Sequence, residues 1–237
     1  MNTTPCALCC RARRLRKSHV VPEFAYQSAY DDKHRLIEYD PVTQEKKRPL
    51  QKGLYCRLLC DDCEQLINDQ YEKPFLKYWR NGDVLKPLAT NELIVLDGID
   101  YAKFKLFHLS VLFRAHASGL SNFADIQLGV HADTMRQMVL SGDCGDHSQY
   151  PILCSAICNS LGEILYAFVG PGHMIDLDGA KGFYFTFCGC EWKYMITLEE
   201  IPQLTECCLQ QDGTLPVIKV YPSSLQYYRE LRDSEEC

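Results

Sequence analysis

The chain has 237 residues, 46% hydrophobic and 24% charged, with a net charge of −6, a composition typical of a globular protein. No stretch approaches the roughly 18 apolar residues of a membrane span. Residues 1–14 are polar and cysteine-rich rather than an apolar signal segment. These properties argue against a membrane protein or a membrane-bound partner. Because 14 cysteines without a secretion signal indicate a reducing compartment, we expect a cytoplasmic protein.

Charge is unevenly distributed along the chain. Residues 1–80 carry 15 Lys and Arg against 11 Asp and Glu, whereas residues 81–237 carry 10 against 20. The basic residues cluster in 11–17 and 46–52. A basic part joined to an acidic part is typical of a nucleic-acid-facing module, here expected to contact DNA, on a body that can dock a partner protein. The alternative is a difference that serves only solubility.

Residues 1–80 contain few long apolar periodic stretches, which predicts short elements folded around a metal. A helix is predicted over 64–73, because Leu66, Ile67 and Tyr71 fall at helical intervals. Pro74 is expected at the end or at a kink of this helix. Residues 92–96 are a short strand candidate, closed by the turn residues Asp97 and Gly98.

Two helices are predicted in the middle of the chain. Asp100 can cap a helix over 101–118, in which apolar residues recur at three- and four-residue steps and which ends at Gly119. A second helix is predicted over 131–140, ending before Gly142. The two helices should form an antiparallel hairpin.

Residues 150–222 have the β-branched and aromatic character of strands. Strands are predicted over 152–158 and 163–169 with a turn at 159–162, then over 183–198 with a bulge or bend at Gly189, and over 215–221. Residues 170–173 are interpreted as a tight loop, and a short helix is expected over 225–231. The predicted fold class is α+β: an N-terminal zinc module (1–80), followed by a helical hairpin and an antiparallel sheet (81–237).

Two Cys-x-x-Cys pairs predict a structural zinc site. The pairs are Cys6/Cys9 and Cys60/Cys63, and together they supply four thiolates, the ligand set of a closed tetrahedral zinc site. Cys10 or Cys56 could replace a neighbour, and unligated thiols in a reducing cell are the alternative. The later cysteines Cys154, Cys158 and Cys188 lack this spacing and are expected as buried core thiols.

His19, in the segment Ser-His-Val-Val-Pro, follows the first pair by ten residues. With the two cysteine pairs, this order resembles the zinc-bound branch of the HNH endonucleases, over roughly residues 5–75. The resemblance implies a treble-clef-like ββα element held by structural zinc. It also implies that His19 is the general base of DNA phosphodiester hydrolysis, beside a catalytic Mg²⁺ or Mn²⁺. Such proteins often serve in bacterial defence against phage.

This sequence departs from the HNH pattern at several positions. Ser18 stands where an acidic or histidine metal ligand is usual, and Glu64 stands where a His or Asn is usual but could still hold Mg²⁺. No Asn lies between His19 and Cys60 to orient the base, so Gln44, Gln51 or Asn68 would have to complete the site. The resemblance leads us to expect a metal-dependent HNH-type nuclease. Because of these departures, the alternative is a non-catalytic zinc-stabilised module that binds nucleic acid or protein.

Overall fold

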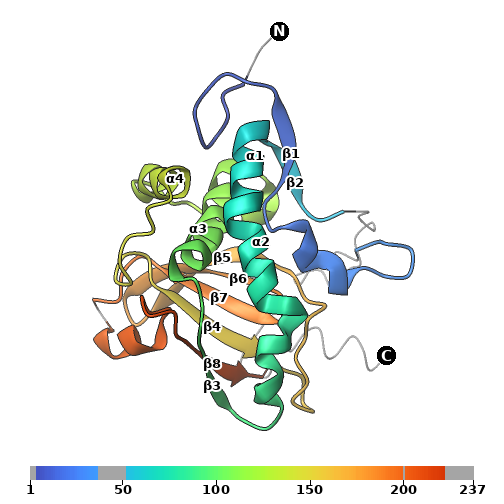
Figure 1. The fold of residues 1–237 in the computed structure, drawn as a ribbon, viewed down its shortest axis with the longest axis vertical. Coiled ribbons are helices and arrows are strands. Elements are labelled where there is room, and N and C mark those ends of the chain that lie inside the picture. Colours follow the sequence, from blue (N-terminus) through green and yellow to red (C-terminus); the bar gives the residue numbers. More distant parts are fainter. Residues whose placement is uncertain (1–3, 37–51, 200, 222–237) are drawn as a thin grey trace.

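The computed structural model describes residues 4–36, 52–199 and 201–221. Within these ranges it is a mixed α+β fold with a two-stranded and a six-stranded sheet (Figure 1). None of the described helices combines the length and the apolar character needed to cross a bilayer. Gln44, Gln51, the basic residues 46–48 and the helix predicted over 225–231 lie outside the described residues.

The N-terminal part is built from one antiparallel strand pair and a helix. Strand β1 (Leu15–His19) pairs with β2 (Tyr55–Cys60), and α1 (Asp61–Ile67) begins directly after β2. A 3-10 helix, Glu23–Ala29, follows β1. Both cysteine pairs therefore lie at the same end of this unit, one before β1 and the other where β2 passes into α1.

The helix predicted over 64–73 begins earlier, at Asp61, and continues past Pro74, with its irregular turn before that residue. Helix α1 passes into a π-helical turn, Asn68–Glu72, and then into α2 (Lys73–Trp79). The π-helical turn lies just before Pro74, which has no N–H to donate to the preceding turn. The left-handed residue Arg80 (φ 41°) ends α2, and a 3-10 helix, Arg80–Ala89, leads to β3 (Leu93–Leu96).

Helices α3 (Tyr101–Ser118) and α4 (His131–Ser141) confirm the two helices predicted in the middle of the chain. The Asp100 side chain accepts a hydrogen bond from the Lys103 backbone N–H at 3.2 Å, and Gly119 adopts φ 64° at the other end of α3. A short 3-10 helix, Ser121–Phe123, lies between α3 and α4, which pack together. Helix α3 is buried along nearly its whole length.

The remaining strands form a sheet with the order β3-β8-β4-β7-β6-β5. These strands are β4 (Ile152–Ile157), β5 (Gly170–Leu177), β6 (Ala180–Phe187), β7 (Cys190–Met195) and β8 (Leu215–Val220). A 3-10 helix, Pro202–Cys207, precedes β8. Strands β4 and β8 pair in parallel, so the sheet is mixed and the prediction of a wholly antiparallel sheet was wrong at this pair. Strand β3, predicted as a short strand over 92–96, pairs with β8.

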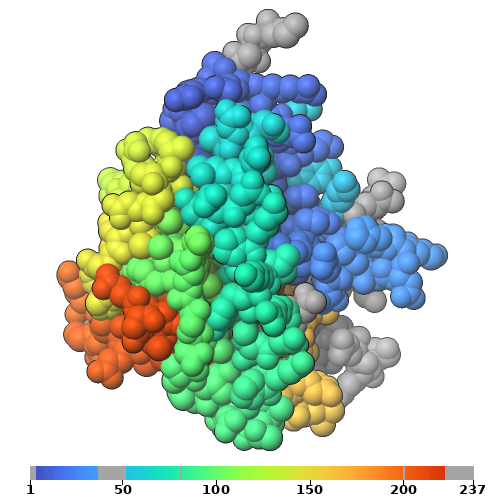
Figure 2. Space-filling view, viewed as in Figure 1, coloured from blue at the N-terminus to red at the C-terminus, as the bar shows by residue number. Residues whose placement is uncertain are grey.

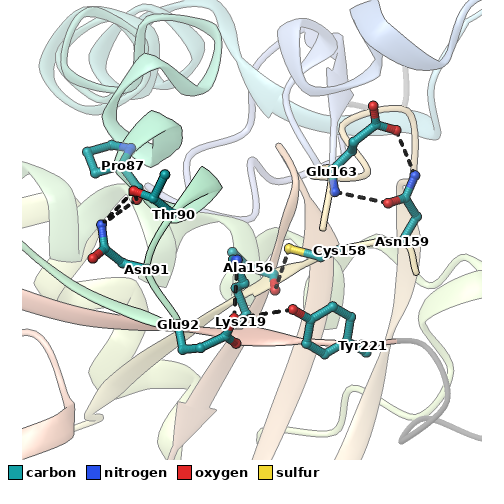
Figure 3. A network of polar contacts seen from close by, with 10 residues as sticks. All are labelled: Pro87, Thr90, Asn91, Glu92, Ala156, Cys158, Asn159, Glu163, Lys219 and Tyr221. Carbon is teal, nitrogen blue, oxygen red and sulfur yellow. Dashed lines mark hydrogen bonds and ion pairs between the residues drawn. The ribbon is translucent and has the colours of Figure 1, made fainter. Parts of the chain in front are cut away.

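Two local predictions in this region were wrong. Residues 163–169 form no strand beyond one isolated bridge at Ile164. Instead, the Asn159 side chain closes a loop. It accepts hydrogen bonds from the Leu161 and Glu163 backbone N–H groups and donates one to the Glu163 carboxylate, and Figure 3 shows its two bonds to Glu163. The segment read as a tight loop, 170–173, instead begins β5. A side chain at Gly172 would meet the Phe185 ring at 2.4 Å, so glycine there allows the strands to approach.

Gly189 marks a hairpin turn rather than a bulge within one long strand. Cys188 (φ 55°) and Gly189 (φ 79°) connect β6 to β7 as a two-residue turn with both residues left-handed. This is the turn that matches the twist of an antiparallel hairpin, and it favours glycine at such positions.

A single large core joins the N-terminal part to the sheet. Phe75 of α2 stacks on Phe107 of α3 with ring centroids 4.0 Å apart, and Trp79 packs against Trp192 of β7 at 5.2 Å. The Trp79 indole N–H also donates to the Cys188 backbone carbonyl at 3.2 Å. In Figure 2 the blue and cyan N-terminal segments and the green segments that follow them form a continuous surface. The division at residue 80 remains a prediction about sequence organisation.

Candidate metal centre and the neighbouring histidine site

The first cysteine pair lies in a tight turn before β1. Cys10 donates its backbone N–H to the Cys6 carbonyl at 2.9 Å, and Cys6 donates to the Arg11 carbonyl at 2.9 Å. Cys10 adopts φ 59°, so it provides the left-handed residue that closes the turn and is exposed, away from the metal cluster. In this structure Cys10 is therefore not a substitute for Cys9.

The four predicted cysteines converge on one point. The sulfur atoms of Cys6, Cys9, Cys60 and Cys63 all lie within 4.8 Å of one another, and Cys9 Sγ lies 3.8 Å from Cys60 Sγ. Four sulfurs in a tetrahedron at the usual Zn–S distance of about 2.3 Å are about 3.8 Å apart. The donor set and its spacing thus fit a metal ion such as zinc, and the prediction that these cysteines form a potential metal site is confirmed.

The pKa values of the thiols differ within the cluster. Burial acts to raise the pKa of the Cys9 thiol, but hydrogen bonds from the Arg11 backbone and the other three thiols outweigh it and lower this pKa to about 7. Burial raises the pKa values of Cys60 and Cys63. A bound cation would stabilise all four as thiolates, because metal ligation and deprotonation of cysteine are coupled.

His19 is the last residue of β1 and faces a carboxylate that the sequence analysis did not identify. His19 Nε2 lies 2.9 Å from Glu23 Oε2, within ion-pair distance, but this contact lacks the geometry of a hydrogen bond, and neither atom has a hydrogen-bond partner among the described residues. The other carboxylate oxygen, Glu23 Oε1, accepts from the Tyr30 hydroxyl at 2.5 Å. The spacing His-x-x-x-Glu, with Pro22 starting a 3-10 helix, brings Glu23 back beside the imidazole. Pro22 was the sequence feature that could have indicated this contact, because it marks the start of a helical turn and such a turn makes residues four apart neighbours.

Electrostatics keeps His19 neutral near pH 7. Burial lowers its pKa below the usual 6.5, Glu23 acts to raise it, and the Arg114 guanidinium acts to lower it further. A neutral imidazole has one nitrogen that can accept a proton. The structure thus places a neutral imidazole at contact distance from a carboxylate.

Arg114 of α3 connects this site to the body of the protein. Its guanidinium is buried, donates to the His19 backbone carbonyl at 2.9 Å and pairs with Glu72 Oε1 at 2.8 Å. Its Nε donates to the Ser110 carbonyl at 3.2 Å. Arg114 thus fixes the end of β1 from a helix that lies 95 residues later in the chain.

Glu64 and the other predicted metal-site residues lie in separate surroundings. The buried Ser18 hydroxyl accepts from the Leu59 backbone N–H at 3.1 Å and bonds the Glu64 carboxylate. Burial raises the pKa of Glu64, and its Oε1 atom has no hydrogen-bond partner among the described residues. Within the described chain, His19 and Glu64 share no hydrogen bond or ion pair. Asn68 is exposed and bonds Asp69 at 3.1 Å.

Apart from the four cysteines, the described residues bring no three His, Cys, Asp or Glu side chains close enough to hold a metal. The side chains described beside His19 therefore do not by themselves form a Mg²⁺ or Mn²⁺ site. Cys154 and Cys158, expected as core thiols, are buried, and Cys188 is partly buried. None of these later cysteines belongs to a potential metal cluster in the described ranges.

Comparison of the chain with protein-family models, with curated proteins and with solved structures finds no match in any of the three. The assignment of a function therefore depends on the geometry of the cysteine cluster and of the histidine beside it.

Proposed function

We propose that this chain is a zinc-stabilised nuclease of the HNH type, which hydrolyses phosphodiester bonds with His19 as the general base. The observation that carries the proposal is the 2.9 Å contact between His19 and Glu23 at the end of β1. The order of elements supports it, because a cysteine turn, two strands and a helix that starts between the second pair of cysteines are the elements that a treble-clef-like ββα arrangement would need.

In the proposed reaction, the chain's own residues move one proton and position the base. A His19 nitrogen accepts a proton from water, whose oxygen forms a bond to phosphorus while the P–O ester bond breaks and the leaving oxygen takes a proton from solvent. Glu23 stabilises the imidazolium that results, and Tyr30 holds the carboxylate. Glu23 would take the orienting role of the Asn that this sequence lacks. Because the described side chains form no second metal site, no step is assigned to a divalent ion.

The proposal is tested by cleavage of plasmid and oligonucleotide DNA by the purified chain, with Mg²⁺, with Mn²⁺ and without added metal. We expect His19→Ala to reduce the rate about 10²–10⁴-fold, the usual contribution of a general base, with unchanged zinc content. His173→Ala is the matched control, because His173 also pairs with a carboxylate, Asp125, at 3.2 Å, but on β5. Cleavage that persists in His19→Ala would show that the base lies elsewhere.

The pH dependence of the cleavage rate gives a second test, because a purely structural role of Glu23 would leave the position of its acidic limb unchanged. Since the pKa of His19 is lowered, the rate should rise with pH through a value below 6.5 and be constant near neutrality. Glu23 acts to raise that pKa, so Glu23→Gln should shift the acidic limb of the profile to still lower pH and reduce the plateau rate. If the acidic limb of Glu23→Gln lies at the wild-type pH, the group that titrates is not His19.

The second candidate is a zinc-stabilised module that binds nucleic acid or protein without cleaving it. It is favoured by one observation, the lack of a second group of metal ligands among the described side chains. A chain that binds DNA but gives no cleavage with any of these metals would support this candidate. Defence against phage and docking of a protein partner on the acidic part remain predictions.

A further inference from the structure

The exposed face of the β1–β2 pair carries an unusual placement of charge. Lys17 and Arg57 are directly opposite each other on the two antiparallel strands. Two like charges in such a position repel and destabilise a strand pair. Both side chains are exposed, and neither forms an ion pair with a described carboxylate. The fold thus retains a repulsive cross-strand pair that a single neutral residue would relieve.

The surface around this pair is hollowed and lined by cations. A hollow of about 310 Å³ is lined by Leu15 and by the four basic residues Arg14, Arg16, Lys17 and Arg57. The Arg57 guanidinium is held toward it by a 2.9 Å hydrogen bond to the Leu15 carbonyl. Of the four, Arg16 has a carboxylate near it, Asp61 at 3.4 Å, and both groups are largely exposed. The hollow therefore has an excess of positive charge.

The hollow and the histidine site lie on the same side of the strand pair. Directly opposed residues of an antiparallel pair project to the same face, and so do residues two apart on one strand. Lys17, Arg57, His19 and Tyr55 consequently share one face. Tyr55 is 37% exposed and lies between the two sites, with Lys17 Nζ 4.9 Å from its ring centroid and the His19 ring 5.7 Å away.

We infer that this hollow binds a backbone phosphate of a nucleic-acid strand, one nucleotide away from the phosphate at His19. A step of two residues along a strand covers about 6.6 Å, which is close to the spacing of neighbouring phosphates in an extended strand. Lys17 and Arg57 supply the charge, and Tyr55 supplies an exposed aromatic surface for the sugar or base between the two phosphates. The register relative to His19 rests on the proposed function, whereas the phosphate site itself does not.

The test is binding of a fluorescent 20-nucleotide DNA, single-stranded and duplex, to the full chain at several salt concentrations. Loss of one duplex phosphate contact should weaken binding about eightfold at 0.1 M salt and reduce the slope of log K against log[salt] by about 0.9. Because both cations face the same phosphate, we expect this full change for the double variant Lys17→Gln/Arg57→Gln, and a smaller change in the same direction for each single variant. Lys181→Gln, an exposed lysine on β6, is the matched control and should leave the slope unchanged.

Thermal unfolding separates a binding role from a structural one. Because each substitution removes a repulsion, Lys17→Gln and Arg57→Gln should unfold at the wild-type temperature or above it while binding is lost. Wild-type affinity and slope in the double variant would overturn the phosphate site, even if His19-dependent cleavage is found. Conversely, reduced binding in these variants together with no cleavage by the wild type would retain the site and reject the proposed nuclease.

Discussion

A single buried arginine determines how the histidine site is held. The Arg114 guanidinium contacts the backbone of β1, the carboxylate of Glu72 and the carbonyl of Ser110, so three segments depend on one side chain. Its side chain is 2% exposed, whereas that of Glu72 is 18% exposed. A charge in such surroundings is tolerated only while its partners remain, because an unpaired buried ion loses its hydration without compensation.

We therefore predict that Glu72→Ala, which leaves the buried Arg114 charge without its partner, destabilises the fold by about 3–5 kcal/mol. Arg114→Met removes the buried charge, keeps an apolar stem of similar length and should be tolerated better than Glu72→Ala. Urea unfolding of both variants measures the difference. Arg80→Met, at an exposed position that ends α2, is the control and should change stability by less than about 0.5 kcal/mol. If Glu72→Ala is as stable as the wild type, the Arg114 guanidinium remains hydrated without Glu72, and the prediction is wrong.

At the level of single residues, the sequence predicted the metal centre better than the histidine site. The four cysteines are recognisable because Cys-x-x-Cys spacing is a local requirement of metal ligation. Glu23 becomes a partner of His19 only once Pro22 has started a helical turn, and Arg114 reaches β1 from a distant helix. The first pairing is local and Pro22 could have indicated it, whereas the contact of Arg114 depends on the tertiary fold, which a one-dimensional pattern does not encode.

Among the elements, the six-stranded sheet depends on a close approach of β6 and β7. A Cβ atom at Gly182 of β6 would lie 2.5 Å from the Tyr194 backbone oxygen and 2.8 Å from the Met195 sulfur. A backbone atom of a paired strand cannot move aside as the end of a flexible side chain can. Glycine at this position is therefore required by packing.

We predict that Gly182→Ala destabilises the protein by about 1–3 kcal/mol, the usual effect of overpacking a core. Gly119→Ala is an informative comparison, because Gly119 has open space around its Cβ position but adopts φ 64°. Its expected effect is about 1–2 kcal/mol, which comes from the left-handed backbone alone. Chemical unfolding measures both. A Gly182→Ala variant as stable as the wild type would mean that β6 and β7 can separate without loss.

The helices were more predictable than the strands for a physical reason. The bounds of α3 follow from Asp100, Gly119 and the apolar periodicity between them, all of which are local. The pairing of β4 with β8 joins residues 63 positions apart, as Cys154 and Val217 show, with three strands between them in the sequence. The β-type residues of 163–169 could not indicate that Asn159 closes a loop there. Composition identifies strand-forming segments, but sheet order is set by long-range packing.

For the molecule as a whole, the metal centre and the sheet share one core. The protein has two tryptophans, Trp79 and Trp192, which pack against each other across this shared core. Their fluorescence therefore reports on the contact between α2 and β7. Metal binding is expected to contribute about 10 kcal/mol or more to folding of the N-terminal part.

We predict that a strong chelator removes one zinc per chain and lowers the unfolding midpoint of the entire protein, by about 2–4 °C for each kcal/mol lost. The tryptophan emission should shift to the red in the same transition in which the circular dichroism of the sheet is lost. Cys60→Ser should reproduce this behaviour without chelator, and Cys207→Ser, at an exposed cysteine, should not. A sheet that unfolds in a separate, unshifted transition would show that the two parts are energetically independent.

The cysteine cluster also has a consequence for how the protein can vary. Cys9 and Cys60, 51 positions apart, are drawn together by the same cluster. The entropy of closing a flexible loop grows only with the logarithm of its length, so doubling the loop adds about 0.6 kcal/mol. Insertions or deletions between the two pairs should therefore be nearly neutral, provided that β1, Glu23 and β2 are kept. Homologues of this chain should be sought by the two cysteine pairs and the Ser-His-Val-Val-Pro-Glu segment, with the intervening length left free.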